Sequence, residues 1–486
     1  MERYIPWSCL AASSLLCMLM TLTGCSLQKT YRYEEIKASH AVPVGMRPWQ
    51  EAEVPGPGRA VHGSLSCAQA IAIALQKNPG NQMALARIRQ TEAGLMQANA
   101  AFYPTLGFYT EYTHADAPSV YLFKKIDQRQ LPPAADFNNP GRLDNFESGV
   151  RGRLNLANGG RDYLNRRMAQ TGLTISQLDQ ESVENGLIAS VISAYHEALA
   201  TREFIGIARD SVATVRKELE LMRVRLRGGS ALKADLLSLE ARLAHSQEEL
   251  VQSRNHHQTA LTALATLLGM DQDAEVVLAE PDDVDAAALP PTYRQGLAYA
   301  LAQRPDLKKM QAQVQKTAMA VDAAHSTYLP RLDVQGKYYL DDEELAYDSR
   351  RENWMVAVIL NWDIFTGFSS QAAVDKASAQ LAETLAADRQ SRLAVKRDVK
   401  IAYQNLEAAG ARLEAARRSA AAAEESLALV LTQFQGGSAT ITRYLQAELA
   451  WNRARIRATA AHYDRQQALA QIGRSIGYWA KIKEAR

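Results

Sequence analysis

The sequence repeats itself, and this repeat constrains the fold more than any other feature. The tripeptide Gly228-Gly229-Ser230 returns as Gly436-Gly437-Ser438, a separation of 208 residues. Four further pairs keep the same separation: Gly159 and Gly367, Tyr195 and Tyr403, Glu240 and Glu448, and Gly269 and Gly477. Because no insertion interrupts this register, the chain is predicted to be a tandem duplication that folds as one architecture with two-fold pseudosymmetry.

A second register precedes the first. Asn78-Pro79 matches Arg304-Pro305, and Tyr103-Pro104 matches Leu329-Pro330, both at a separation of 226 residues. Since the separation then falls from 226 to 208, the first copy carries about 18 extra residues between Pro104 and Gly159. We therefore expect a first repeat over residues 64–270, a crossover over 271–291, a second repeat over 292–478 and a C-terminal tail over 479–486.

The N-terminus has the pattern of a secretory signal over residues 1–24, with Arg3, an uncharged apolar run over 10–22 and small residues just after it. It ends in Leu22-Thr23-Gly24-Cys25, which resembles the bacterial lipoprotein box, in which the cysteine is lipidated and becomes the first mature residue. The alternative is a plain secretory signal with an incidental cysteine. Ser26 follows in place of an inner-membrane aspartate, which favours the outer membrane. Residues 25–63, rich in Pro, Gly and polar residues, are predicted to be a lipidated tether.

Composition and motifs favour no catalytic chemistry. The formal net charge of +2 gives no support for nucleic acid as a partner. With Cys25 lipidated, Cys67 is the one cysteine left in the mature chain, so no internal disulfide can form. His256 and His257 are adjacent, so on a helix they point about 100° apart and cannot share a metal. We therefore expect no enzyme, no metal and no cofactor apart from the lipid on Cys25.

Four segments show the alternation of β-strands, with apolar residues at every second position over about ten residues. The apolar sets are Leu106, Phe108 and Tyr112; Phe146, Val150 and Leu154; Leu332, Val334 and Tyr338; and Trp354, Val356, Val358 and Leu360. Ten residues is about the length of a tilted membrane strand, although a half-buried sheet in a soluble sandwich shows the same alternation. The connections over 113–145 and 341–353 are expected to be exposed loops.

Four strands cannot close a barrel. An open sheet edge is not tolerated in lipid, because its backbone groups would lack hydrogen-bond partners. If the strands span a membrane they must therefore be shared between chains, and three copies would contribute 12.

A helical pattern with coiled-coil spacing follows each second strand. In the first copy it runs for 67 residues, from Arg161 to Arg227, which is about 100 Å at 1.5 Å per residue. The return helix, Ser230 to Leu268, has only 39 residues. A helix over Ser66 to Ala101, interrupted at Pro79, is therefore expected to stack on its end and complete the length.

These features together resemble the TolC-like outer-membrane factors of tripartite efflux and secretion systems, in their lipoprotein branch. The stretch from Leu65 to Asn78-Pro79 is similar to the family's opening signature, and the segments over 300–307 and 328–332 resemble its mid-chain one. Gly229, followed six residues later by Asp235-Leu236-Leu237, is similar to its hairpin tip. The resemblance covers nearly the whole mature chain.

The resemblance implies a mixed α and β membrane protein, in which a trimeric 12-stranded outer-membrane β-barrel, four strands per chain, is continued by a long periplasmic α-helical barrel. The homotrimer would conduct passively through outer-membrane lipid, with energy supplied by an inner-membrane transporter through a periplasmic adaptor protein. The runner-up is a lipid-anchored periplasmic coiled-coil scaffold without a channel, whose alternating segments form a soluble sheet.

The turns at Gly228-Gly229-Ser230 and Gly436-Gly437-Ser438 are expected to form the periplasmic mouth, where the helices reverse, gate the duct and meet the adaptor. Glycine suits the left-handed turn that ends a helix, and Arg225 and Arg227 favour the C-terminus before it. Ser230 and Ser438 are expected to cap the helices that follow.

The second-copy tip departs from the family pattern. In the best-known member two acidic residues there make a cation-selective ring, whereas this chain has Arg443, the counterpart of Asp235, and Gln446 one turn on. We therefore expect that ring to be absent and Asp235 to pair with Arg443 across the closed mouth. The alternative is that both are solvated surface charges.

Overall fold

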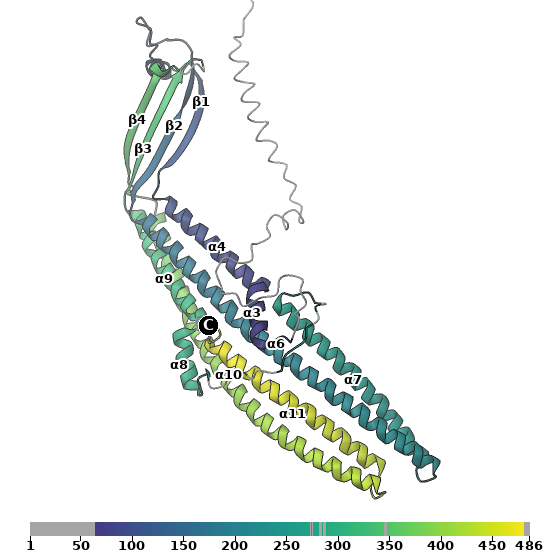
Figure 1. Cartoon of the computed structure of the whole chain (residues 1–486). Helices are drawn as coiled ribbons and strands as arrows, with labels where there is room; N and C mark the ends of the chain where they lie inside the picture. The colour runs from purple at the N-terminus through teal and green to yellow at the C-terminus, as the bar shows by residue number, and fades with distance from the viewer. Residues whose placement is uncertain are drawn as a thin grey trace, which may run out of the picture. The chain divides into compact units, whose positions relative to one another are not determined.

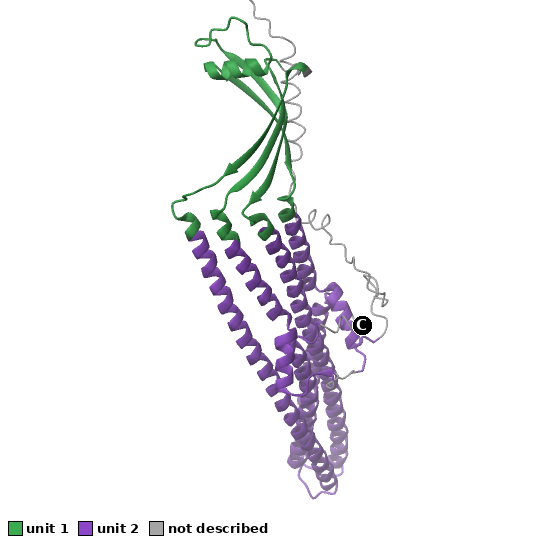
Figure 2. Ribbon diagram, turned by 90° about the vertical axis from the view of Figure 1, so that its left-hand side faces the viewer, with its two compact units in different colours: residues 1–50, 97–164, 323–371 green, residues 51–96, 165–322, 372–486 purple. Residues whose placement is uncertain are grey.

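The computed structural model describes residues 64–480, except 273, 275, 281–283, 285–287 and 345–347. The signal peptide, Cys25, the tether and most of the C-terminal tail lie outside the described residues, and the crossover is described only in part. The described chain divides into two compact units, shown in two colours in Figure 2, and each draws on both copies of the repeat. One unit contains the strands and the other contains most of the helical residues.

The strands form one antiparallel sheet in the order β1-β2-β3-β4 (Figure 1). Their bounds are β1 (Thr105–Ala115), β2 (Leu143–Asn158), β3 (Arg331–Asp342) and β4 (Glu352–Asn361). All four predicted strands are confirmed. The strands β1 and β4 are the two edges of the sheet, and the register of β2 against β3 shifts between Asn155 and Ala157.

The two faces of the sheet differ as the alternation predicts. The register places Phe108 opposite Val150 and Tyr338 opposite Trp354, so the apolar residues share one face. That face is open, with Phe108 and Trp354 each 76% exposed. The other face carries charged and hydroxyl side chains, among them Arg153, which donates to Asp333. The sheet therefore has an apolar face that no described residue of the chain covers.

The connection between β1 and β2 is not the exposed loop that the sequence predicted. This connection contains helix α5 (Pro118–Asp127), and β1 and β2 extend into the two ends of the predicted loop. Proline is tolerated in the first turn of a helix, where its missing N–H would have no partner. Ten residues give fewer than three turns, which is too short for helical periodicity to stand out from a loop. The shorter connection before β4 includes the 3-10 turn η3 (Ser349–Arg351).

The long helices repeat without any change in length. Helices α6 (Arg161–Arg227) and α10 (Ser369–Gln435) have 67 residues each, as predicted for α6. Helices α7 (Lys233–Leu268) and α11 (Ile441–Ile476) have 36 residues each. The first return helix thus begins three residues later than Ser230, the predicted start.

The shorter helices come in pairs that break at proline. They are α3 (Cys67–Lys77) with α4 (Pro79–Ala100), and α8 (Tyr293–Gln303) with α9 (Pro305–His325), which is followed by the 3-10 turn η2 (Ser326–Tyr328). Asn78 and Arg304 are extended because a residue before proline avoids the helical region. The Ser66 and Gln69 side chains cap α3 reciprocally, a capping box that their spacing predicts.

The expected stacking on the end of α7 is confirmed, and the second copy has the same arrangement at the end of α11. At the end of α7, Asn78 Nδ2 donates to the Leu267 carbonyl at 2.9 Å. At the end of α11, Arg304 Nη1 donates to the Ser475 carbonyl, also at 2.9 Å. Gly269 has a φ of +65°, and a Cβ there would lie 2.5 Å from the Lys77 carbonyl oxygen. Glycine is therefore required where the two helix ends meet.

The duplicated tyrosines fasten the segments that precede α3 and α8. Tyr195, which is fully buried, donates its hydroxyl to the Leu65 carbonyl at 2.9 Å. Its counterpart Tyr403 donates to the Pro290 carbonyl at 2.6 Å. Leu65 also forms a parallel bridge with Leu278, so the described part of the crossover packs against the core.

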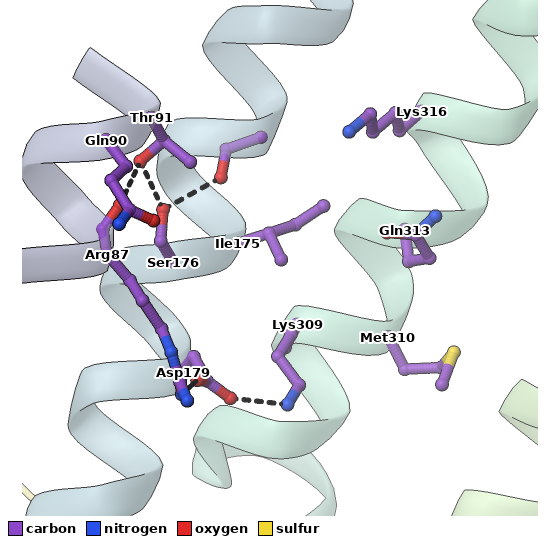
Figure 3. A pocket seen from close by; sticks show the side chains of 11 residues that line it. Arg87, Gln90, Thr91, Ile175, Ser176, Asp179, Lys309, Met310, Gln313 and Lys316 are labelled. Atoms are coloured by element: carbon purple, nitrogen blue, oxygen red, sulfur yellow. Dashed lines mark hydrogen bonds and ion pairs between the residues drawn. The ribbon is translucent and has the colours of Figure 1, made fainter. Parts of the chain in front are cut away.

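Figure 3 shows a groove in which polar links join α4, α6 and α9. Asp179 of α6 accepts a hydrogen bond from Lys309 of α9 at 2.7 Å and lies 3.5 Å from Arg87 of α4. The Thr91 and Ser176 hydroxyls are 2.7 Å apart. These ion pairs are partly exposed, so they orient neighbouring helices more than they stabilise them. Among the helices that the structure describes, none is both long and apolar enough to cross a membrane.

Candidate functional site

The two hairpin turns have the same backbone geometry. Gly229 and Gly437 lie in the left-handed region, with φ of +73° and +78°. In the first turn the Ser230 amide donates to the Arg225 carbonyl at 2.9 Å, and in the second the Ser438 amide donates to the Gln433 carbonyl at 2.8 Å. These bonds close the C-termini of α6 and α10, as the glycine pairs predict.

The prediction for the two turn serines is wrong. Their hydroxyls donate backwards, from Ser230 to the Arg225 carbonyl and from Ser438 to the Gln433 carbonyl, each at 3.1 Å. The helices that follow begin later, with Leu232 and Thr440 as their N-caps, and only Thr440 accepts a hydrogen bond through its side chain. The reason is that the left-handed turn directs each serine toward carbonyls left open at the end of the preceding helix.

A hydrophobic cluster joins the two hairpins near their turns. Its buried members are Val215, Leu219, Met222, Leu239, Val430, Phe434, Ile441 and Tyr444. The rings of Phe434 and Tyr444 stack with their centroids 5.2 Å apart. Burial raises the pKa of the Tyr444 hydroxyl, and it also raises the pKa of the nearby Glu218 carboxyl. The tips thus form one packed end within a single chain.

Arg225 links the two tips directly. Its guanidinium donates at 3.0 Å to the carbonyl of Gln435, which is the last residue of α10. It also lies over the Phe434 ring, 5.7 Å from the centroid. The sequence pointed to Arg225 as a charge that favours the end of its own helix, whereas the structure places it at the end of the other hairpin. The equivalent position in the second copy, 208 residues later, is Gln433. The second copy therefore has no arginine at this position to make the reciprocal link to the first tip.

The predicted gate residues lie in the first turns of the return helices. Asp235 is half-buried at the start of α7, and Arg443 and Gln446 are exposed at the start of α11. The ion pairs within the described single chain do not include Asp235 with Arg443. The pairing of Asp235 with Arg443 on neighbouring hairpins, across the closed mouth, stays a prediction.

A buried polar network ties α6, α7 and α11 together further along the hairpins. Glu448, 1% exposed, accepts from Arg242 Nε at 2.9 Å and from Ser211 Oγ at 2.8 Å. Asn452 donates to the same carboxylate and to Ser211. Glu240, the counterpart of Glu448, is instead partly exposed and bound to Arg223.

This network was not predicted from the sequence, although the duplication contains a signal for it. The position equivalent to Arg242 in the second copy is Ala450, and the position equivalent to Asn452 in the first copy is Ala244. Polar residues that replace alanine in only one copy of a repeat mark places where the two hairpins must differ.

The other residues singled out in the sequence lie away from the tips. His257 is hydrogen-bonded to Thr201 at 3.1 Å, and burial lowers the pKa of its imidazole, while His256 is exposed. Cys67 is half-buried and, like Ile71 and Leu75, packs against a hydrophobic core cluster. No group of three His, Cys, Asp or Glu side chains in the described part of the chain is placed to hold a metal ion.

Comparison with known proteins gives the class to which this architecture belongs. The family profile of the outer membrane efflux protein matches residues 70–270 and 297–478. The chain is 26% identical to protein CyaE of Bordetella pertussis over 399 residues, covering 81% of this chain and 80% of the relative. It is 23% identical to the pyoverdine export outer membrane protein OpmQ of Pseudomonas aeruginosa over 394 residues, 81% of each chain.

Solved structures share the fold. The Campylobacter jejuni CmeC outer membrane channel superposes with a TM-score of 0.73 at 15% identity, covering 85% of each chain. The Vibrio cholerae outer membrane protein VceC superposes with a TM-score of 0.71 at 18% identity, covering 85% of this chain and 96% of the other. The chain belongs to the outer membrane efflux protein family, whose members are outer-membrane transport proteins.

Proposed function

We propose that this chain is the outer-membrane duct of a tripartite efflux or type I secretion system. Three copies close a 12-stranded barrel in the outer membrane, and their helices form a periplasmic tunnel. Substrate is handed over by an inner-membrane transporter and a periplasmic adaptor that meets the tips at Gly228-Gly229-Ser230 and Gly436-Gly437-Ser438. Conduction is passive and uses no cofactor.

The observation that carries this proposal is the open sheet with its bare apolar face. Edge strands β1 and β4 each have a row of backbone groups that no other strand in the described part of the chain pairs with. In lipid such edges need partners, and joining β4 of one copy to β1 of the next supplies them. Val356, Val358 and Leu360, each more than 60% exposed, would then face lipid.

Native mass spectrometry in detergent tests the assembly. We expect a trimer that needs detergent to stay in solution. Without detergent or lipid, the exposed apolar face of the sheet would be buried only by aggregation. A variant in which a cleavable, non-lipidated secretory signal replaces residues 1–25 should still need detergent if the sheet is membrane-embedded. A detergent-independent monomer of that variant would support the lipid-anchored scaffold and contradict the duct.

We also propose that Cys25 carries acyl chains that anchor the tether in outer-membrane lipid. Replacing Cys25 by alanine is expected to abolish labelling by a clickable palmitate analogue, because the lipoprotein box offers one thiol as the acceptor. Cys67→Ala is the matched control and should label like the wild type. Label that persists on Cys25→Ala would place the modification elsewhere.

A further inference from the structure

Helix α5 is fastened to the polar face of the sheet. Lys124 of α5 donates to Asp341 of β3 at 2.9 Å and also to Glu147 of β2. One turn on, Gln128 donates to Asn145 of β2 at 2.8 Å. These strand residues share a face with Arg151 and Lys337 in the register and lie opposite the bare apolar side chains.

The contacts extend across the width of the sheet. Asn353 of β4 donates to the Asp127 carbonyl of α5 at 3.2 Å. Glu147 is reached in turn by the Tyr109 hydroxyl of β1. Helix α5 thus lies over the polar face of the sheet at the ends of several strands, where the chain turns from one strand to the next (Figure 2).

Exposure along the polar face shows what α5 covers. Asn145 and Asp341 are fully buried, although both are polar and belong to a sheet with no second sheet packed on it. Closer to the other end of β2, the Arg153 side chain is 50% exposed. Buried carboxylates persist in proteins when they are paired, and Lys124 supplies that pairing.

The described residues of the second copy contain no counterpart of α5. The connection between β3 and β4 runs from Asp342 to Glu352 and has no helix longer than η3 among its described residues. The extra residues of the first copy lie in the connection that contains α5. One α5 per chain is therefore an addition to the repeat, and it lies on the face with the charged residues.

We infer that α5 narrows the outer opening of the duct and limits the size of what leaves it, and that Lys124 holds it in that position. The inference rests on the proposed function, because the polar face lines the lumen only if the apolar face meets lipid in a closed barrel. In that barrel, three α5 helices project inward at the strand ends opposite those that connect along the chain to α4, α6, α9 and α10. Lys124 is a positioning residue, since it acts through α5.

Cysteine accessibility in intact cells tests this inference. Gly107 lies on the polar face of β1, opposite Arg151, and a Cβ there meets no atom within 4 Å. In a Cys67→Ala background, Gly107→Cys should react from outside with a small sulfonated maleimide but slowly with a large maleimide–polyethylene glycol. Adding Lys124→Met should speed the reaction with the large reagent about tenfold or more, since two charge-assisted hydrogen bonds are lost.

Two controls separate release of α5 from other effects. Lys337 donates to the same Glu147 carboxylate at 2.9 Å but belongs to β3, so Lys337→Met should leave labelling by the large reagent slow. Asn139→Cys, in the exposed connection after α5, should react with both reagents equally in all backgrounds. Equal amounts of trimer on native gels would show that Lys124→Met still folds, and Lys124→Arg should restore protection.

The unfavourable outcomes are distinct. If the large reagent reaches Gly107→Cys as fast as Asn139→Cys in the wild-type background, α5 does not narrow the opening. If it is excluded equally with and without Lys124→Met, Lys124 is not what holds α5. Val356→Cys, on the apolar face, tests the barrel itself. If it reacts with the small reagent as fast as Gly107→Cys, water reaches both faces of the sheet, and the proposed duct fails.

Discussion

In the proposed duct, replacing Arg443 by aspartate is expected to loosen the closed periplasmic mouth and to raise cation selectivity. The exposed Arg443, predicted to pair with Asp235 of a neighbouring hairpin, would be replaced by a residue with the same charge as Asp235. Each such pair contributes at most about 1 kcal/mol, but the proposed trimer would repeat it three times at one constriction. Single-channel conductance and reversal potentials in planar bilayers measure both effects.

The charge-swapped double variant provides the internal check on this prediction. Adding Asp235→Arg to Arg443→Asp should partly restore closure, because the pair is then re-formed with the opposite polarity. Arg453→Asp, an equal charge reversal at an exposed position further along α11, should leave both quantities at wild-type values. Identical conductance and selectivity in the wild type, the single variant and the double variant would remove Arg443 from the gate.

Replacing Glu448 by leucine should destabilise the buried packing of α11 against α6 and α7. Arg242 is itself 9% exposed and would lose the buried carboxylate that it binds through Nε and Nη2, keeping the 3.3 Å contact of Nη1 with the partly exposed Glu249. Breaking a buried ion pair on one side costs about 3–5 kcal/mol. Hydrogen exchange of α11 amides is therefore expected to accelerate about a hundredfold or more, at roughly tenfold for each 1.4 kcal/mol.

The duplication supplies the matched control for this second prediction. Glu240→Leu makes the same change at the counterpart position, where the side chain is 42% exposed. We therefore expect the free energy of unfolding to fall by about 1 kcal/mol or less. The double variant Glu448→Leu with Arg242→Met should recover much of the lost protection, because no buried charge is then stranded. If Glu448→Leu and Glu240→Leu accelerate exchange equally, the network does not stabilise the hairpins.

The sequence predicted most of the fold because a duplication presents each local signal twice. The bounds of α6 follow from Gly159 and Gly229, and the same glycines recur in the second copy at Gly367 and Gly437. Glycine with positive φ, proline after an extended residue and strict alternation are local rules, so they can be read without knowing what packs against them.

What the sequence did not predict depends on contacts between the copies or on short elements. The reach of Arg225 to the Gln435 carbonyl and the burial of Glu448 require the two hairpins to be placed side by side first. The ten-residue helix α5 has too few turns to reveal a periodicity. The turn serines were assigned to the wrong helix because a serine after a left-handed glycine can reach carbonyls behind it as well as amides ahead of it.

The equal lengths of α6 and α10 limit how such a protein can evolve. Deleting one turn from α6 alone would withdraw its tip by about 5.4 Å, which would break the Arg225 link and uncover Phe434 and Tyr444. A codon-level insertion or deletion in one hairpin is thus selected against unless its counterpart changes too. The connection that contains α5 already differs in length from its counterpart in the other copy. Inherited length variation should therefore accumulate in the strand connections, copy by copy, while the hairpins change in pairs.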